Sequence, residues 1–157
     1  AWLRARDAKL PWEAALDVLG NAPYAALSSD PGALAAVRAD TMQAVQDLRQ
    51  GRLDVVRTAE RWGRGEDFPH RLACLETWLT GLVLRACDTT GEKREMRPGA
   101  HLSGPEADIN IAGALGLLDH LTEMRQQAAT PLNKGLVLER FLWRLGRVAT
   151  RQQSRGV

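Results

Sequence analysis

The chain has 157 residues, of which 45% are hydrophobic and 25% are charged. This profile is typical of one folded domain, or one domain plus a fragment, and excludes a wholly disordered chain. Lysine and arginine number 21 against 19 acidic residues, and this net charge of +2 is too balanced to indicate a strong field toward nucleic acid or membranes. No apolar run approaches the roughly 18 residues that cross a bilayer, and no secretory signal is visible. We therefore expect a cytoplasmic protein without a membrane segment.

The N-terminal residues predict short helices. Residues 2–8 have the pattern of the end of a helix. A second helix follows with Pro11 at its first position, and residues 20–23 end it because they contain Gly and Pro. The apolar side of this second helix carries Trp12, Ala15, Leu16 and Leu19. A brief helical stretch at 24–27 completes a small N-terminal piece that we assign to residues 1–28.

The next residues predict two further helices. Asp30 is a suitable cap and Pro31 suits the first turn of a long helix that ends at Gly51. Its apolar side is formed by Leu34, Val37, Val45 and Leu48. A shorter helix covers residues 53–62, and the Gly-Arg-Gly sequence at 63–65 breaks it.

The most regular apolar pattern begins near residues 67–69. Its large apolar residues alternate between spacings of four and three, the period of a helix packed in a bundle. They are Phe68, Leu72, Leu75, Leu79, Leu82 and Ala86. Residues 88–106 break the pattern with Gly, Pro, Thr and charged residues, which predicts a mobile loop.

Two more helices are predicted after this loop, at about 107–128 and 131–151. The first turns inward Ile111, Leu115, Leu118, Leu121 and Met124. The second starts with Thr130 as a cap and Pro131 in its first turn, and it buries Leu138, Phe141, Leu142, Leu145 and Val148. Residues 152–157 form a frayed tail. Strand patterns are nearly absent, so the prediction is an all-α bundle of four or five long helices within residues 29–151.

The sequence shows no constellation that predicts catalysis, a cofactor or a metal. The Gly-Arg-Gly sequence at 63–65 follows a helix and lacks the Lys-Ser/Thr pair of a phosphate-binding loop. The three histidines, His70, His101 and His120, lie on separate elements, although His120 and Glu123 can share a face as a solvated pair. Cys74 and Cys87 are too far apart on one helix for a disulfide, and we expect both to be buried thiols.

The last predicted helix carries an arginine row and an off-centre tryptophan. Arg140, Arg144, Arg147 and Arg151 stack on one face. Such a row is either a solvated face that suits the helix dipole or a contact surface for an acidic partner or nucleic-acid backbone. Trp143 is either an edge-of-core residue or an anchor for a partner. We expect no clear aromatic platform for bases on this face. The predicted interface consists of Leu136, Val137, Arg140, Trp143, Arg144 and Arg147.

Two stretches carry a family resemblance. Residues 131–145 read PLNKGLVLERFLWRL, in which an Asn opens a helix and apolar residues around an acidic one lead into Leu and Arg. Residues 15–27 read ALDVLGNAPYAAL and contain a small-Pro-x-Ala-Ala-Leu pattern. These stretches, with the order of the helices, resemble the delta-prime subunit of the bacterial DNA polymerase III clamp loader.

The resemblance implies a fold and a role. Residues 1–28 are then a remnant of the AAA+ lid region, and residues 29–151 are the C-terminal helical collar domain. The role is a non-catalytic assembly module that joins the ATPase (gamma/tau) and delta subunits, so that the sliding clamp is loaded on primed DNA. Clamp-loader ATPases usually carry a nucleotide-sensing Arg at the position of Tyr24, and its absence fits a subunit that does not hydrolyse ATP.

The same resemblance sets expectations about chemistry and partners. The parent holoenzyme is a DNA-directed DNA polymerase, whereas this chain by itself is not expected to be an enzyme or to hold a cofactor. DNA is expected to be reached only through the complex, and no membrane is involved. Two alternatives remain: a helical nucleic-acid-binding domain that uses the arginine face, and the collar domain of a clamp-loader ATPase subunit.

Overall fold

The structure is a computed structural model that describes residues 11–19, 30–91, 111–127 and 133–150. Every regular element in these ranges is an α-helix, which confirms the predicted all-α class. The helices are α2 (Trp12–Val18), α4 (Pro31–Arg49), α5 (Val55–Arg64), α6 (Phe68–Gly91), α7 (Ile111–Gln127) and α8 (Lys134–Thr150). The helical stretches predicted at 2–8 and 24–27, most of the loop predicted at 88–106, and the tail at 152–157 lie outside the described residues.

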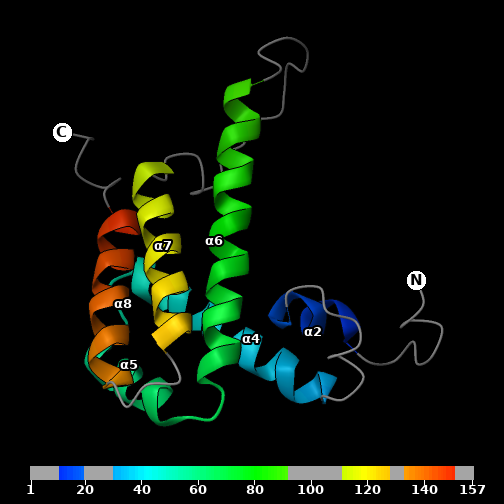
Figure 1. The fold of residues 1–157 in the computed structure, drawn as a ribbon, viewed down its shortest axis with the longest axis vertical. Coiled ribbons are helices and arrows are strands. Elements are labelled where there is room, and N and C mark those ends of the chain that lie inside the picture. Colours follow the sequence, from blue (N-terminus) through cyan, green and yellow to red (C-terminus); the bar gives the residue numbers. More distant parts are fainter. Residues whose placement is uncertain (1–10, 20–29, 92–110, 128–132, 151–157) are drawn as a thin grey trace.

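The three longest C-terminal helices form the body of the bundle. In Figure 1, α6 runs up, α7 runs down beside it and α8 runs up again, and the C-terminal end of α6 extends beyond the other two. Helix α5 packs against α8 at the base, and α4 crosses the bundle to contact both α6 and α8. Helix α2 rests on α4 and α6 at the side of the bundle. The arrangement leaves the outer side of α8 uncovered by any described helix.

Side-chain caps determine where α4 and α5 begin. Asp30 accepts a hydrogen bond from the Gly32 amide at 2.8 Å at the start of α4, as predicted, with Pro31 as the first helical residue. Asp54 accepts from the Arg57 amide at 3.0 Å at the start of α5. At the other end of α4, Gly51 has a φ of +68°, which L side chains rarely adopt.

Three predicted helix boundaries were wrong. Helix α5 continues through Gly63 to Arg64, because the glycine meets a neighbouring helix and needs no turn. Helix α6 continues to Gly91, so residues 88–91 belong to it and not to the predicted loop. Helix α8 begins at Lys134 and not at Pro131, because the Asn133 side chain accepts from the Leu136 amide at 3.3 Å and caps the helix there.

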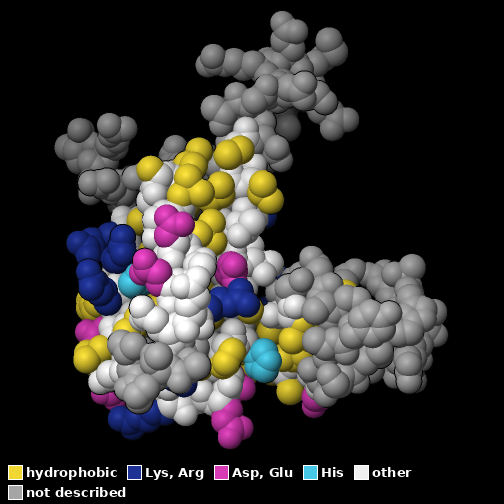
Figure 2. All heavy atoms as spheres, in the orientation of Figure 1, with side chains coloured by type: hydrophobic (Ala, Val, Ile, Leu, Met, Phe, Trp, Pro, Cys, Tyr) yellow, Lys and Arg dark blue, Asp and Glu magenta, His cyan; other side chains and the backbone are white. Residues whose placement is uncertain are grey.

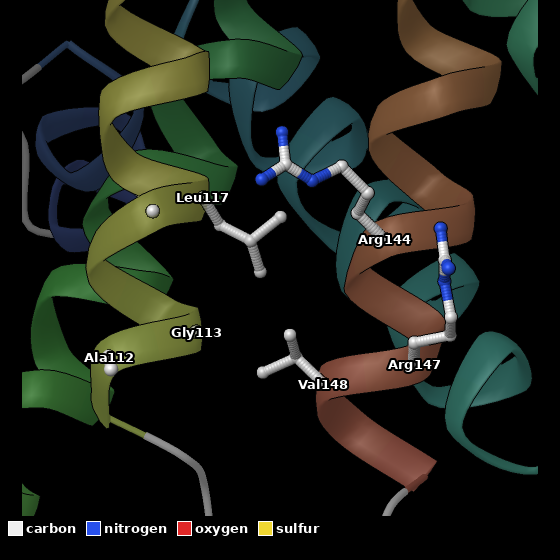
Figure 3. A pocket seen from close by; sticks show the side chains of 7 residues that line it. Ala112, Gly113, Leu117, Arg144, Arg147 and Val148 are labelled. Carbon is white, nitrogen blue, oxygen red and sulfur yellow. The ribbon is translucent and has the colours of Figure 1, made fainter.

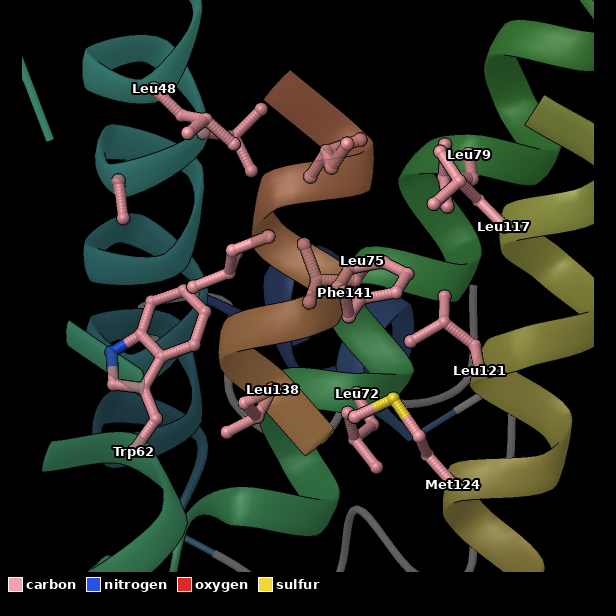
Figure 4. Packing of buried hydrophobic residues seen from close by; sticks show 14 of the residues in the cluster. Leu48, Trp62, Leu72, Leu75, Leu79, Leu117, Leu121, Met124, Leu138 and Phe141 are labelled. Carbon is pink, nitrogen blue, oxygen red and sulfur yellow. The ribbon is translucent and has the colours of Figure 1, made fainter. Parts of the chain in front are cut away.

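One continuous core joins α4 to α8 (Figure 4). The predicted residues of α6 from Phe68 to Leu82 are all buried, which confirms the bundle period of that helix. Trp62 from α5 and Phe141 from α8 are the largest fully buried side chains. A smaller cluster, in which Ala15 and Val18 meet Leu34 and Cys74, attaches α2 to the bundle. Burying a leucine or phenylalanine stabilises the fold by about 1.5–3 kcal/mol, so this core provides most of the driving force for folding.

The inward face predicted for α7 was partly wrong. Leu121 and Met124 are buried as expected, but Leu115 is 48% exposed. Ala114 and Leu117 take the inward positions, and with Leu121 and Met124 they form one continuous stripe along the helix. The prediction failed because residues 111–118 carry apolar side chains all around the helix, so their spacing does not distinguish Leu117 from Leu115 and Leu118.

Two features hold the elements together beyond apolar burial. The Arg71 guanidinium, only 12% exposed, donates to Asp40 Oδ2 at 2.6 Å and to Thr41 Oγ1 at 3.2 Å, and it lies 4.9 Å over the Trp62 ring. These contacts tie α4, α5 and α6 to one another. Helices α5 and α8 cross at Gly63, where an added Cβ would lie 2.7 Å from the Gly135 amide nitrogen.

Candidate docking surface on α8

The outer side of α8 exposes two large apolar side chains. Trp143 is 53% exposed and Leu136 is 62% exposed, although both belong to a helix whose opposite side is fully buried. The residues Leu138, Phe141, Leu142 and Leu145 occupy that buried side, as predicted. Trp143 and Leu136 are seven residues apart and therefore lie on the same side of the helix, and Trp is enriched at interface hot spots. The position of Trp143 therefore favours a partner anchor over an edge-of-core residue.

Arginines surround this apolar pair. Dark blue side chains gather over α8 in Figure 2, and the described members of the predicted row are Arg140, Arg144 and Arg147. Arg140 and Arg147 are exposed, whereas Arg144 is partly buried beside α7. Within the described part of the chain, no carboxylate lies within 4 Å of any of the three. No carboxylate of the described residues therefore neutralises their positive charge.

Trp143 and two of the arginines share one shallow hollow. It has a volume of about 420 Å³ and is lined by Leu136, Glu139, Arg140, Trp143 and Arg147. An exposed indole between two guanidiniums is a platform on which aromatic or basic groups can stack. Trp143 is the one aromatic side chain that lines this hollow, and the expectation that the face lacks a clear platform for bases stays a prediction.

A second hollow lies between α7 and α8 (Figure 3). It has a volume of about 440 Å³, and its α7 wall is formed by Ala112, Gly113 and Gly116. Arg144 and Arg147 form part of the opposite wall, and Arg144 extends from α8 toward α7 in Figure 3. We call this hollow the α7–α8 groove. The sequence did not predict this groove, because its walls come from two separate helices and no sequence motif links their residues.

His120 belongs to α7 and faces α8. Its ring stacks on Phe141 with 6.1 Å between centroids, and its Nδ1 lies 3.6 Å from Glu123 Oε2. Burial lowers the pKa of His120 below its ordinary value of 6.5, and the positive charges of Arg144 and Arg140 lower it further, whereas Glu123 raises it. The His120 side chain is only 15% exposed whereas Glu123 is 67% exposed, so the expectation of a solvated pair holds for the glutamate and is wrong for the histidine.

The six predicted interface residues divide between this surface and the core edge. Leu136, Arg140, Trp143 and Arg147 line the shallow hollow, while Arg144 and Arg147 line the α7–α8 groove. Val137 is half-buried and packs against the main core. The structure therefore brings four of the six together in the shallow hollow, while Arg144 lies in the α7–α8 groove and Val137 at the core edge.

The other candidate residues from the sequence do not converge. Cys74 is buried as expected, but Cys87 is exposed, because it lies near the end of α6 that extends past α7 and α8. His70 is half-buried near the start of α6, and His101 lies outside the described residues. The described residues contain no group of three or more His, Cys, Asp or Glu side chains placed to hold a metal ion.

A second exposed apolar area was not predicted. Hydrophobic side chains gather over the upper parts of α6 and α7 in Figure 2, where Leu84 is 59% exposed and Leu115 is 48% exposed. Leu84 follows the buried Leu82 by two residues, and residues two apart on a helix face different sides. The exposure of Leu84 could therefore have been predicted from the sequence. None of the described helices has the length and hydropathy that a membrane span requires.

Comparisons with known proteins identify no relative. No protein-family model, no curated protein and no solved structure matches this chain.

Proposed function

We propose that this chain is a non-catalytic assembly module of the bacterial replicative clamp loader, corresponding to the C-terminal collar region of the delta-prime subunit. In this role it works in the cytoplasm and joins the ATPase (gamma/tau) and delta subunits, so that the sliding clamp is loaded on primed DNA. It performs no bond-making of its own, needs no cofactor, and meets DNA only through the complex. The all-α bundle is compatible with a collar domain, and the family resemblance of residues 131–145 supports the assignment.

The observation that carries the proposal is the exposed pair Trp143 and Leu136 on α8. Both side chains lie within the stretch that resembles the family, and both line one hollow with Arg140 and Arg147. A specific protein interface buries roughly 800 Å² per partner and is centred on aromatic or arginine anchors within a polar rim. The outer side of α8 has this composition.

The proposal predicts that Trp143 is a binding hot spot. Mixing the chain with purified clamp-loader ATPase and delta subunits is expected to yield a complex by light scattering at micromolar concentration. Trp143→Ala is expected to cost about 2 kcal/mol or more of binding free energy, roughly thirtyfold in Kd, because the indole is the largest anchor. Leu136→Ala is expected to weaken binding in the same direction.

Leu84→Ala is the matched control, because Leu84 is 59% exposed against 62% for Leu136 and lies on α6. It is expected to leave the Kd unchanged. The proposal fails if no complex forms, or if Leu84→Ala weakens binding while Leu136→Ala and Trp143→Ala do not.

A nucleic-acid-binding domain is the second candidate, and the stacking platform of Trp143 between Arg140 and Arg147 favours it. Salt distinguishes the two. Binding to phosphates weakens steeply as salt rises, whereas apolar assembly changes little. The collar of a clamp-loader ATPase subunit shares the architecture of the main proposal, and Tyr24, where those ATPases usually carry an Arg, is the residue that favours delta-prime.

A further inference from the structure

We propose that the α7–α8 groove binds an acidic segment of a protein chain, whose carboxylates pair with Arg144 and Arg147. This site is distinct from the hollow around Trp143, although Arg147 lines both. The inference does not rest on the clamp-loader assignment, because it depends only on the charges and shape of the groove.

The first argument is the state of the two guanidiniums. Several other arginines of the described residues form ion pairs with carboxylates. Arg71 pairs with Asp40 at 2.6 Å, and Arg52 pairs with Asp47 at 3.2 Å. Arg144 and Arg147 have no described carboxylate within 4 Å. Arg144 is also partly buried, so it has lost part of its contact with water without gaining an anion. A ligand that brings oxyanions offers Arg144 the strong, charge-assisted hydrogen bonds that the described residues do not make with it.

The described acidic residues near the groove do not pair with Arg144 or Arg147. On α7, Glu123 lies 3.6 Å from His120, and Asp119 is exposed without an ion pair to these arginines. On α8, Glu139 lines the shallow hollow and not the groove. On α7, burial lowers the pKa of His120, the positive charges of Arg144 and Arg140 lower it further, and Glu123 raises it. An incoming carboxylate would complement the positive charge of these arginines.

The shape of the groove favours a protein chain over a nucleic acid. Ala112, Gly113 and Gly116 leave one wall without long side chains, and a Cβ added at Gly116 meets no atom within 4 Å. This wall leaves room for an extended backbone to lie close to α7. Leu117 and Val148 also line the groove and point into it, where they can contact the methylenes of glutamate (Figure 3). No aromatic side chain lines it, whereas single-stranded nucleic acids are held by stacking on aromatic rings.

The test measures the binding of a fluorescent oligoglutamate peptide to the full chain by fluorescence anisotropy. A labelled oligothymidylate of equal length is titrated separately, so that the affinities of an acidic peptide and a nucleic acid can be compared. The peptide is expected to bind more tightly than the oligothymidylate. Arg144→Gln combined with Arg147→Gln is expected to raise the peptide Kd about tenfold. The matched control combines Arg52→Gln, between α4 and α5, with Arg64→Gln at the end of α5, which removes the same charge from exposed positions away from the groove. It is expected to change the Kd less than about threefold.

A second variant tests the groove itself without changing any charge. Gly116→Leu fills the open space on α7 and is expected to raise the peptide Kd at least severalfold, while circular dichroism and the Tm report that the fold is retained. Amide shifts of Gly113, Gly116 and Leu117 in the unsubstituted chain are expected to move on peptide addition, and they locate the site even if a variant fails to fold.

Four results overturn the proposal. Tighter binding of the oligothymidylate assigns the arginines to nucleic acid. Equal losses in the two double variants reduce the effect to net charge. Unchanged binding in Gly116→Leu, with no amide shifts on α7, places the peptide on the outer arginines and not in the groove. Absence of any peptide binding removes the site. Each result leaves the Trp143-dependent assembly untouched, so the two proposals can fail separately.

Discussion

At the scale of single residues, this protein places two polar side chains in apolar surroundings by different means. Arg71 is almost enclosed, and Asp40, Thr41 and the Trp62 ring surround its guanidinium. His120 has less compensation, because its buried Nε2 has no hydrogen-bond partner among the described residues and arginines lie nearby. The contacts of Arg71 therefore offset the burial of its guanidinium, whereas burial at His120 disfavours the protonated imidazole.

The first prediction concerns the pH dependence of stability. Because the pKa of His120 is lowered in the folded state, the unfolded chain binds a proton more readily between that lowered pKa and about 6.5. Acidification through this window therefore favours unfolding, and the contribution of His120 to stability is fully present only above it. Urea unfolding at about pH 7.5 and 5.5 is expected to show a larger loss of stability in the unsubstituted chain than in His120→Gln.

The difference in stability loss between the unsubstituted chain and His120→Gln isolates the histidine, because the other titratable groups are present in both. Arg144, Arg140 and Glu123 face His120 and are present in both. Equal losses of stability on acidification in His120→Gln and the unsubstituted chain would show that the histidine is not held in its neutral form.

At the scale of the elements, the contact between α5 and α8 depends on two glycines. An added Cβ at Gly63 would lie 2.7 Å from the nitrogen and 3.0 Å from the Cα of Gly135, and these backbone atoms cannot rotate away. The absence of side chains lets the two helices approach closely, so the core residues on both sides of the crossing interdigitate. Gly63, which the sequence predicts to break the helix, is here a packing requirement inside it.

The second prediction follows from this crossing. Gly63→Ala is expected to lower the free energy of unfolding by about 1–3 kcal/mol, because α5 and α8 must separate to accept the methyl group. Gly116→Ala is the matched control: it is also a helical glycine, but its Cβ finds open space, and its better helix propensity is expected to raise stability by up to about 1 kcal/mol. Urea denaturation measures both, and a neutral Gly63→Ala would show that the helices do not cross this closely in solution.

At the scale of the whole molecule, the bundle is closed around its core but open along α8. The main core draws on α4, α5, α6, α7 and α8 and leaves Trp143 and Leu136 outside. An exposed apolar pair of this kind, rimmed by arginines, is a surface that the described residues do not cover and that another molecule can bury. The same surface limits self-association, because the unneutralised arginines of two copies repel each other at close range.

The third prediction applies this balance to the isolated chain. Weak self-association is expected in sedimentation equilibrium, and it is expected to strengthen with salt as the repulsion between arginines is screened. Trp143→Ser is expected to reduce it at every salt concentration, because the apolar contact drives it. Self-association that weakens with salt, or that Trp143→Ser does not change, would contradict an apolar interface on α8.

The sequence by itself determined the all-α class, the positions of the long helices and most of the core of α6 and α8. Spacings of three and four along a helix set which side is buried, and caps such as Asp30 act within one turn, so both can be read locally. Only the tertiary structure decided the inward face of α7, the role of Gly63 and the existence of the α7–α8 groove. These depend on which helix lies opposite, and contacts between residues distant in the chain leave no periodic trace in the sequence.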